Sequence, residues 1–202
     1  QTRTSNGGDF NNELVVMSPL DEGEIRTIYK PGKGKFIGDV DLHWDADKLL
    51  FTSQVDPGEL KDAPLRATRR YRVFELKKGK VRRINPGMAD DIDNFYPCYL
   101  PDGRIVFAST AAYEGVPCVG GGSYVANLYR MDSDGSNVRR LTFDQDASWH
   151  PSVQSDGRVM YTRWEYTDSA HYFSRVLMTM NPDGTDQKAY YGSNSYWPNS
   201  IF

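Results

Sequence analysis

The sequence is poor in several features on which common classes of protein depend. Only two of its 202 residues are cysteines and three are histidines. No Cys-x-x-Cys-His motif occurs, so covalent c-type haem is not expected, and no apolar run approaches the roughly 18 residues of a membrane-spanning helix. The formal net charge of −3 gives no general attraction to nucleic acid or to an anionic membrane. We therefore predict no nucleic-acid partner and no membrane span.

Short catalytic motifs are also missing. There is no Gly-x-Ser-x-Gly elbow, no phosphate-binding loop and no nucleophile–base pair that stands out. The acidic segment with Asp90, Asp91 and Asp93 offers oxygen ligands for a hard cation, but it lacks the calcium-loop pattern and also fits a solvated turn. His43 and His171 are isolated and show no metal-ligand spacing. We predict no catalytic residue, no metal site and no cofactor, and whether the protein is an enzyme stays open.

The sequence is rich in short β-forming runs joined by tight turns. Residues 97–107 place an Asp-Gly pair between two such runs, the strongest local signal for a β-hairpin. Residues 127–142 follow with another strand, an Asp-Gly turn and a strand. Two linked hairpins predict one four-stranded antiparallel sheet.

This arrangement recurs along the chain. Residues 151–161 repeat the first hairpin 54 positions later, and residues 177–184 repeat the second. Residues 41–51 and 73–84 are degenerate versions upstream. A period of about 50 residues with four strands per unit is typical of a β-propeller. The alternative is an unrelated all-β sandwich with common Asp-Gly turns.

The repeats predict a polar lead-in at residues 1–12, followed by a β-propeller region at residues 13–202 with about four blades represented. That region divides into a partial blade at 13–30, complete blades at 39–84, 94–142 and 148–190, and the start of a next blade at 194–202. We expect a piece of a larger ring, because closing the ring with the two ends would leave one strand missing.

Long links are predicted between the second and third strands of each blade. In a propeller they emerge on the same face as the links between blades, and long loops on a rigid scaffold commonly carry binding residues. The segment from Arg163 to Tyr166 starts one such link, with a guanidinium fork and flat amphipathic rings. The predicted binding residues on this face are Arg163, Trp164, Glu165, Tyr166, Trp149, His150 and Tyr196.

These residues also have simpler interpretations. Arg163 and Glu165 could form an ion pair that holds the link, with Trp164 packed between blades. His150 could be a packed ring that donates to a backbone carbonyl rather than a base or a ligand. The two cysteines, Cys98 in a first strand and Cys118 in the long link of the same blade, are candidates for a disulfide in an oxidising compartment, with free thiols as the alternative.

Residues 99–107, 128–137, 161–166 and 178–185 together resemble one family, the hydrazine synthase α-subunit family, in its middle propeller region. The resemblance covers about residues 40–190. Its Asp-Gly repeats also occur in TolB-type propellers, whereas Arg-Trp-Glu-Tyr after a strand is more specific. The resemblance implies a bacterial periplasmic or extracellular module within a larger polypeptide. In hydrazine synthase, haem carried by the α-subunit performs the redox chemistry, and this sequence lacks the haem-attachment motif.

These observations predict a binding or scaffold module. Its Tyr-, Trp- and Arg-rich loop face would meet a protein, peptide or glycan partner, and its flanks would meet other domains or blades of the same polypeptide. The alternative is part of a redox or hydrolytic enzyme whose cofactor is held elsewhere.

Overall fold

The computed structural model describes residues 10–21, 23–55, 70–85, 88–116, 124–164 and 175–193, and the regular structure within these ranges is β-sheet. The strands are β1 (Leu14–Ser18), β2 (Glu24–Tyr29), β3 (Ile37–Leu42), β4 (Lys48–Val55), β5 (Arg70–Lys77), β6 (Lys80–Arg83), β7 (Asn94–Tyr99), β8 (Ile105–Ser109), β9 (Asn127–Met131), β10 (Arg139–Arg140), β11 (Ser148–Val153), β12 (Val159–Trp164), β13 (Arg175–Met180) and β14 (Lys188–Tyr191). None of the described residues forms a helix long and apolar enough to cross a membrane.

The described strands form three four-stranded antiparallel sheets that follow one another along the chain. We call them blade I (β3 to β6), blade II (β7 to β10) and blade III (β11 to β14), and within each blade the strands pair in chain order. These sheets confirm the predicted all-β architecture of four-stranded blades. The predicted start of a further blade at 194–202 and most of the lead-in lie outside the described residues.

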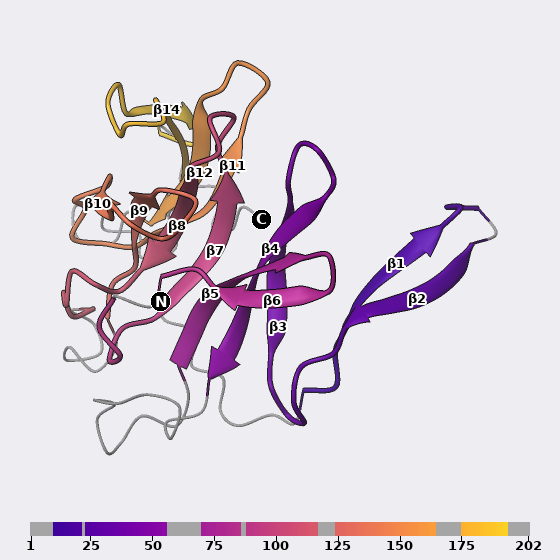
Figure 1. Ribbon diagram of the computed structural model, residues 1–202. Helices are drawn as coiled ribbons and strands as arrows, with labels where there is room; N and C mark the ends of the chain where they lie inside the picture. Colours follow the sequence, from indigo (N-terminus) through magenta and orange to yellow (C-terminus); the bar gives the residue numbers. More distant parts are fainter. Residues whose placement is uncertain are drawn as a thin grey trace.

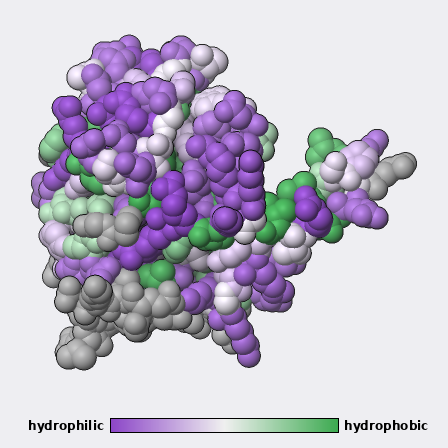
Figure 2. All heavy atoms as spheres, viewed as in Figure 1, coloured by the Kyte–Doolittle hydropathy of each residue, from purple (hydrophilic) through white to green (hydrophobic). Residues whose placement is uncertain are grey.

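Strands β1 and β2 form a separate two-stranded sheet before blade I. In Figure 1 this hairpin extends away from the three blades. Its described side chains are largely exposed although many of them are apolar, as Figure 2 shows by the green atoms along the hairpin. Val16 is 40% exposed and Ile25 is 63% exposed.

The tight turns follow from local backbone chemistry. Gly103 and Gly157 both have φ of +84°, in the region where glycine meets no Cβ penalty. At the first turn of blade I, where the sequence has Ala46-Asp47 instead of Asp-Gly, Ala46 itself takes φ of +53°. The degenerate first hairpin is therefore confirmed in spite of its missing glycine.

The core consists of apolar layers between neighbouring blades. Leu50 and Val73 of blade I pack with Tyr99 and Ile105 of blade II. A second layer lies between blades II and III, and includes Leu128 and Tyr161. A third layer joins the hairpin β1–β2 to blade I. Each blade is thus stabilised mainly by the blade next to it.

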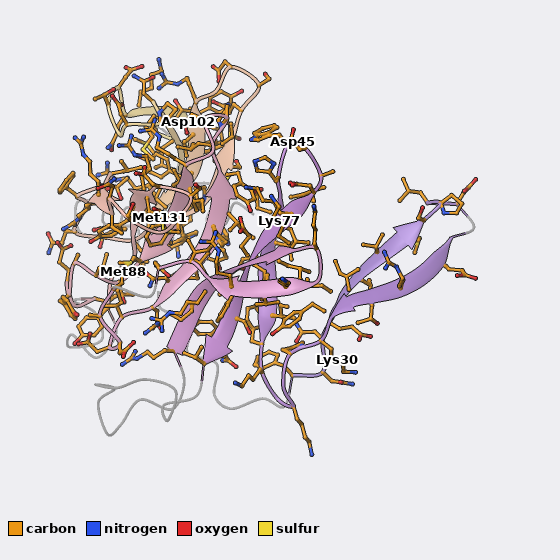
Figure 3. The ribbon with its side chains drawn as sticks, viewed as in Figure 1. Lys30, Asp45, Lys77, Met88, Asp102 and Met131 are labelled. Atoms are coloured by element: carbon orange, nitrogen blue, oxygen red, sulfur yellow. The ribbon has the colours of Figure 1, made fainter. Side chains whose placement is uncertain are left out.

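The strands of a blade run between two faces of the molecule. Figure 3 shows Asp45 and Asp102, both in tight turns, at one end of the strands, and Lys30, which follows β2 in the link to blade I, at the other end. The predicted long links leave from the second face, where β4, β8 and β12 end. We call it the long-link face.

Candidate functional site

The first strands of the three blades contact one another in order, β3 with β7 and β7 with β11. Each has a β-bulge at the same place, with register shifts at Gly38/Asp41, Phe95/Cys98 and Trp149/Ser152. Inside these bulges Asp39, Tyr96 and His150 have φ of +53°, +51° and +52°. Non-glycine residues seldom adopt this conformation, and bulges re-aim side chains. Its recurrence in three blades therefore marks a built feature of the first strands.

The three bulge residues meet side by side. The backbone N–H of Tyr96 donates to Oδ2 of Asp39 at 3.4 Å. The ring of Tyr96 lies against the imidazole of His150, with centroids 4.1 Å apart. All three residues are half-buried. A carboxylate, a phenol and an imidazole from three successive blades are therefore brought together, and we call them the bulge triad.

A row of rings continues from the triad toward the long links of blade III. The ring of Trp149 lies 6.5 Å from that of His150 and 6.4 Å from that of Trp164. The guanidinium of Arg175 lies over both indoles, 4.6 Å from the centroid of Trp164 and 5.6 Å from that of Trp149. We call Tyr96, His150, Trp149, Trp164 and Arg175 the aromatic row. Two neighbouring indoles, tilted by 51° to each other, with a cation above them give a surface with apolar faces and polar edges.

Within the row, the two tryptophans have different roles. Trp164 is 3% exposed and packs against Val116, Val125 and Ala147. Trp149 packs against this cluster but stays half-buried. Trp164 therefore supports the row from behind, as in the packing interpretation, while Trp149 has the exposed ring surface.

Arg163 lies at the end of β12, and its Nη1 is 3.0 Å from Oδ1 of Asp144 in an ion pair. Asp144 also accepts a hydrogen bond from Ser148 Oγ at 3.1 Å. This pair ties β12 to the link between blades II and III. Burial lowers the pKa of Arg175, which its closeness to Asp146 partly offsets.

The structure brings three of the predicted binding residues together, namely Trp164, Trp149 and His150, while Arg163 is paired with Asp144 instead. The other three, Glu165, Tyr166 and Tyr196, lie outside the described residues. Sequence analysis missed Asp39 and Tyr96, although both occupy the position of His150 in their own blades. Aligning the first strands residue by residue would have found them.

The carboxylates of the acidic link between blades I and II interact with other groups of the protein. Asp90 lies 3.5 Å from Nη2 of Arg83, and Asp91 accepts a hydrogen bond from the Tyr113 hydroxyl at 2.7 Å. Asp93 accepts from the backbone N–H of Tyr71 at 2.9 Å, while burial raises its pKa. These carboxylates hold the link against its two blades.

The sequence interpretation of His43 as isolated needs a correction. The turn after β3 brings ligand atoms of His43, Asp45 and Asp47 within 4.8 Å of one another. However, Nδ1 of His43 accepts from the backbone N–H of Asp45 at 3.2 Å, and Asp47 pairs with Lys77 at 3.1 Å. The side chains of this cluster are therefore already engaged, by a contact inside the turn and by the ion pair with Lys77 at the end of β5.

Cys98 lies in β7 and is 5% exposed. Burial, followed by the nearby charge of Asp41, raises the pKa of its thiol to about 12. Cys118 lies outside the described residues, so the disulfide stays a prediction.

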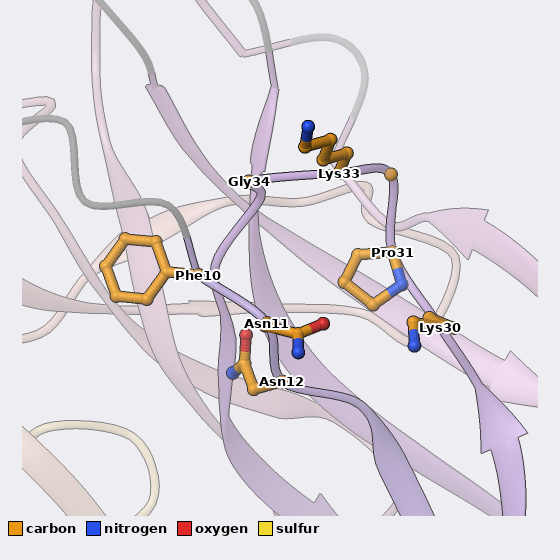
Figure 4. A pocket seen from close by; sticks show the side chains of 8 residues that line it. Phe10, Asn11, Asn12, Lys30, Pro31, Lys33 and Gly34 are labelled. Atoms are coloured by element: carbon orange, nitrogen blue, oxygen red, sulfur yellow. The ribbon is translucent and has the colours of Figure 1, made fainter.

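A separate cavity of about 260 Å³ lies at the base of the hairpin β1–β2. Figure 4 shows that its lining comes from Phe10, Asn11 and Asn12 before β1 and from residues 30–34 after β2. The ring of Phe10 contacts that of Phe36 edge to face at 5.3 Å. This cavity shares no residue with the aromatic row.

The joint between blades I and II makes a testable pH prediction. Oδ2 of Asp41 accepts from the backbone N–H of Tyr99 at 2.8 Å, and burial raises the pKa of Asp41 above its usual 3.8. A raised pKa in the folded state means that ionisation opposes folding, so this group's stabilising contribution is lost as pH rises through the folded-state pKa. We expect Asp41→Asn to gain stability relative to the parent chain from pH 3.8 upward, measured by urea unfolding between pH 3.5 and 7. A difference that is constant over this range would contradict the prediction.

Repeated four-stranded antiparallel sheets, packed face to face with their first strands adjacent, define a β-propeller. Comparison with solved structures supports this class. The fold is similar to a TolB-type protein of Agrobacterium tumefaciens, with 19% identity, a TM-score of 0.57, and coverage of 83% of this chain and 52% of that one.

Hydrazine synthase of Kuenenia stuttgartiensis is also similar, with 14% identity, a TM-score of 0.66, and coverage of 89% of this chain and 28% of that one. An oligogalacturonate lyase in complex with manganese has 15% identity, a TM-score of 0.55, and coverage of 82% and 44%. No protein-family model and no curated protein matches the chain. The chain spans about half or less of the length of these structures, and identities this low show a common fold alone.

Proposed function

We propose that this protein is an extracytoplasmic β-propeller module of a bacterial protein related to the hydrazine synthase α-subunit. In this proposal its long-link face binds a protein, peptide or glycan partner, and its flanks adjoin other blades or domains of a larger polypeptide. The observation that supports it best is the aromatic row, with half-buried Trp149 and His150 beside the guanidinium of Arg175.

The chemistry of the row suits such partners. An indole face binds the apolar face of a sugar ring or a peptide side chain, while its N–H edge and neighbouring charges bind hydroxyl or carbonyl groups. The row is also held in place, because its member Trp164 is buried against Val116, Val125 and Ala147. A rigid surface loses little conformational entropy on binding, which favours affinity.

A second candidate function rests on the bulge triad. Imidazole and carboxylate side chains are the usual acids and bases of enzymes, and backbone strain concentrates at catalytic sites. The fold shared with hydrazine synthase and with a puromycin hydrolase is compatible with part of a redox or hydrolytic enzyme whose cofactor is held elsewhere. Bound haem in the visible spectrum, or hydrolysis of puromycin, would favour this candidate.

The binding function is tested by a thermal-unfolding screen with cello-, chito- and galacturonate oligosaccharides and a set of short peptides. A ligand at 100 times its dissociation constant adds about 2.7 kcal/mol of stability, which raises the melting temperature by several degrees. For any probe that does so, we expect Trp149→Ala to weaken binding by about tenfold or more, since buried aromatic anchors dominate interfaces.

The matched control is Trp44→Ala, because Trp44 is 60% exposed in a tight turn at the opposite face. It should leave the dissociation constant unchanged. A cooperative melt of the Trp149→Ala variant is required to show that it folds. Full affinity in the Trp149→Ala variant, or loss of affinity in the Trp44→Ala variant, would place binding away from the aromatic row.

A further inference from the structure

Equivalent positions of the three first strands differ in exposure. The strand registers align Leu42 with Tyr99 and Val153, and Val40 with Pro97 and Pro151. Tyr99 is 1% exposed, Val153 is half-buried and both prolines are buried. Leu42, in contrast, is 59% exposed and Val40 is 51% exposed. The face of β3 that corresponds to a covered face in blades II and III is therefore open.

The surroundings of Tyr99 show which part of a neighbouring blade buries this position. Tyr99 of blade II packs against the preceding blade, with its hydroxyl donating to Glu75 of β5 and its ring against His43. It also belongs to the apolar layer that contains Leu50 of β4. The inner strands of the preceding blade thus cover this position in blade II.

The hairpin β1–β2 corresponds to the outer half of such a preceding blade. Like β5 and β6, its strands form an antiparallel pair that leads through a link into the first strand of the next blade. Leu14 of β1 and Ile28 of β2 pack on blade I as Val73 and Ile84 of blade I pack on blade II. The hairpin therefore supplies third and fourth strands, while its partner strands are not among the described residues.

The two apolar layers match almost member for member. Leu49, Phe51 and Leu76 of blade I correspond to Ile105, Phe107 and Met131 of blade II, and all belong to their layers. Among the described residues, the hairpin's layer has no counterpart of Leu50, and it does not include Leu42. The complete layer thus differs from the incomplete one in two ways: it has an apolar side chain from a second strand, and it includes Tyr99, the counterpart of exposed Leu42.

An open groove lies at the place of that side chain. Its volume is about 500 Å³, and apolar residues from both sides line it together with the charged residues Arg26, Asp47, Lys48 and Lys78. Ile28, Leu42, Leu49 and Leu76, which correspond to the neighbours of Leu50 in the complete layer, are all part of this lining. The groove is thus lined by the counterparts, one blade earlier, of the residues that enclose Leu50 between blades I and II.

We propose, on the basis of the proposed function in which the flanks adjoin other blades of a larger polypeptide, that this surface docks a β-hairpin of that same polypeptide, which supplies the two inner strands of a further blade. Its second strand pairs with the edge of β1 that faces away from β2, as β4 pairs with β5, and places a leucine-sized side chain in the groove. Its first strand covers Val40 and Leu42. The occupant is thus an alternating two-stranded hairpin, and the exposed apolar residues of β1 and β3 are a docking surface for it.

The repeat also specifies a polar contact. Asp41 accepts a hydrogen bond from the backbone N–H of Tyr99 at 2.8 Å. The corresponding donor on the docking surface is the backbone N–H of Leu42. The incoming first strand is therefore expected to carry a small acceptor such as Asp, Cys or Ser at this position.

The test supplies the hairpin from the chain's own sequence. A copy of residues 37–69, which contains the inner hairpin of blade I and the link after it, is fused directly before Asn11. Asn11 is the position that corresponds to Arg70. We expect hydrogen exchange of the β1 amides that face away from β2 to slow by about tenfold or more, and the melting temperature to rise by several degrees.

Two variants control the test. Leu50→Asp in the copy should remove both effects, because an aspartate cannot replace a leucine among Ile28, Leu42, Leu49 and Leu76. Leu42→Asp in the recipient strand should also remove them, yet should leave the unfused chain as stable as before, since Leu42 is largely exposed.

A fusion that leaves exchange and melting unchanged would overturn the proposal, and so would equal protection by the Leu50→Asp copy. Concentration-dependent dimers of the unfused chain that Leu42→Asp disrupts would replace the hairpin by a second copy as occupant.

Discussion

Replacing Arg72 by alanine is expected to lower the free energy of unfolding by about 3–5 kcal/mol. The side chain of Arg72 is completely buried in β5. Its guanidinium donates to the backbone carbonyls of Tyr71 at 2.8 Å and Asp90 at 2.9 Å, and also to that of Ile92. Alanine would leave these acceptors without their donor, and would leave the partly buried carboxylates of the acidic link without a compensating charge.

The effect should exceed that of an ordinary ion pair because the cation is enclosed. Burial, and then the neighbouring charge of Arg83, lower the pKa of Arg72 to about 10, so the side chain is still charged at neutral pH. Arg104→Ala is the control, since Arg104 pairs with partly exposed Asp102 in a turn. It should change stability by no more than about 1 kcal/mol. Urea unfolding with linear extrapolation measures both, and equal losses would show that Arg72 does not hold the joint.

The second large effect is expected for Gly135→Ala, in the tight turn between β9 and β10. A Cβ at this position would lie 1.8 Å from the backbone oxygen of Ile84, at the end of blade I, and the glycine has φ of +92°. The change therefore adds a steric clash between two blades to the strain of a left-handed alanine. We expect a loss of about 2–5 kcal/mol, the sum of about 1–2 for the conformation and about 1–3 for the overlap.

Gly103→Ala separates these two contributions. Gly103 has φ of +84° in the corresponding turn of the first hairpin, but a Cβ there would meet no atom within 4 Å. It should lose only the conformational part, about 1–2 kcal/mol. Chemical denaturation of the two variants under the same conditions gives the comparison. If Gly135→Ala were no worse than Gly103→Ala, the close approach of blade II to Ile84 would not exist in solution.

Much of the fold could be predicted from the sequence because it depends on local signals. The Asp-Gly pairs mark turns by backbone chemistry, and alternation of apolar residues marks strands, so Gly103 and Gly157 were identified together with their hairpins. The repeat of about 50 residues then allowed the first hairpin of blade I to be recognised although it lacks the Asp-Gly pair. Ala46 could be assigned to a turn only because neighbouring blades have glycine there.

The candidate site was less predictable because its main features depend on contacts between blades. A positive φ at Tyr96 leaves no mark in the sequence, since it arises from a bulge that only the paired strands define. The position of Arg175 over two indoles brings together strands β11, β12 and β13. Trp164 was identified from the sequence, but its burial was not, because the sequence pattern does not distinguish a buried tryptophan from an accessible one.

The layered arrangement has a consequence for how the molecule opens. Blade II is packed on both sides, whereas the described part of blade III has a neighbour on one side only, and the hairpin β1–β2 is a sheet of two strands. Stability in such a linear array is a sum of nearest-neighbour terms, and cooperative unfolding proceeds from its ends. The middle blade is therefore expected to be the last part of the chain to unfold. Tyr96 at its inner edge would keep its conformation when either end of the array unfolds locally.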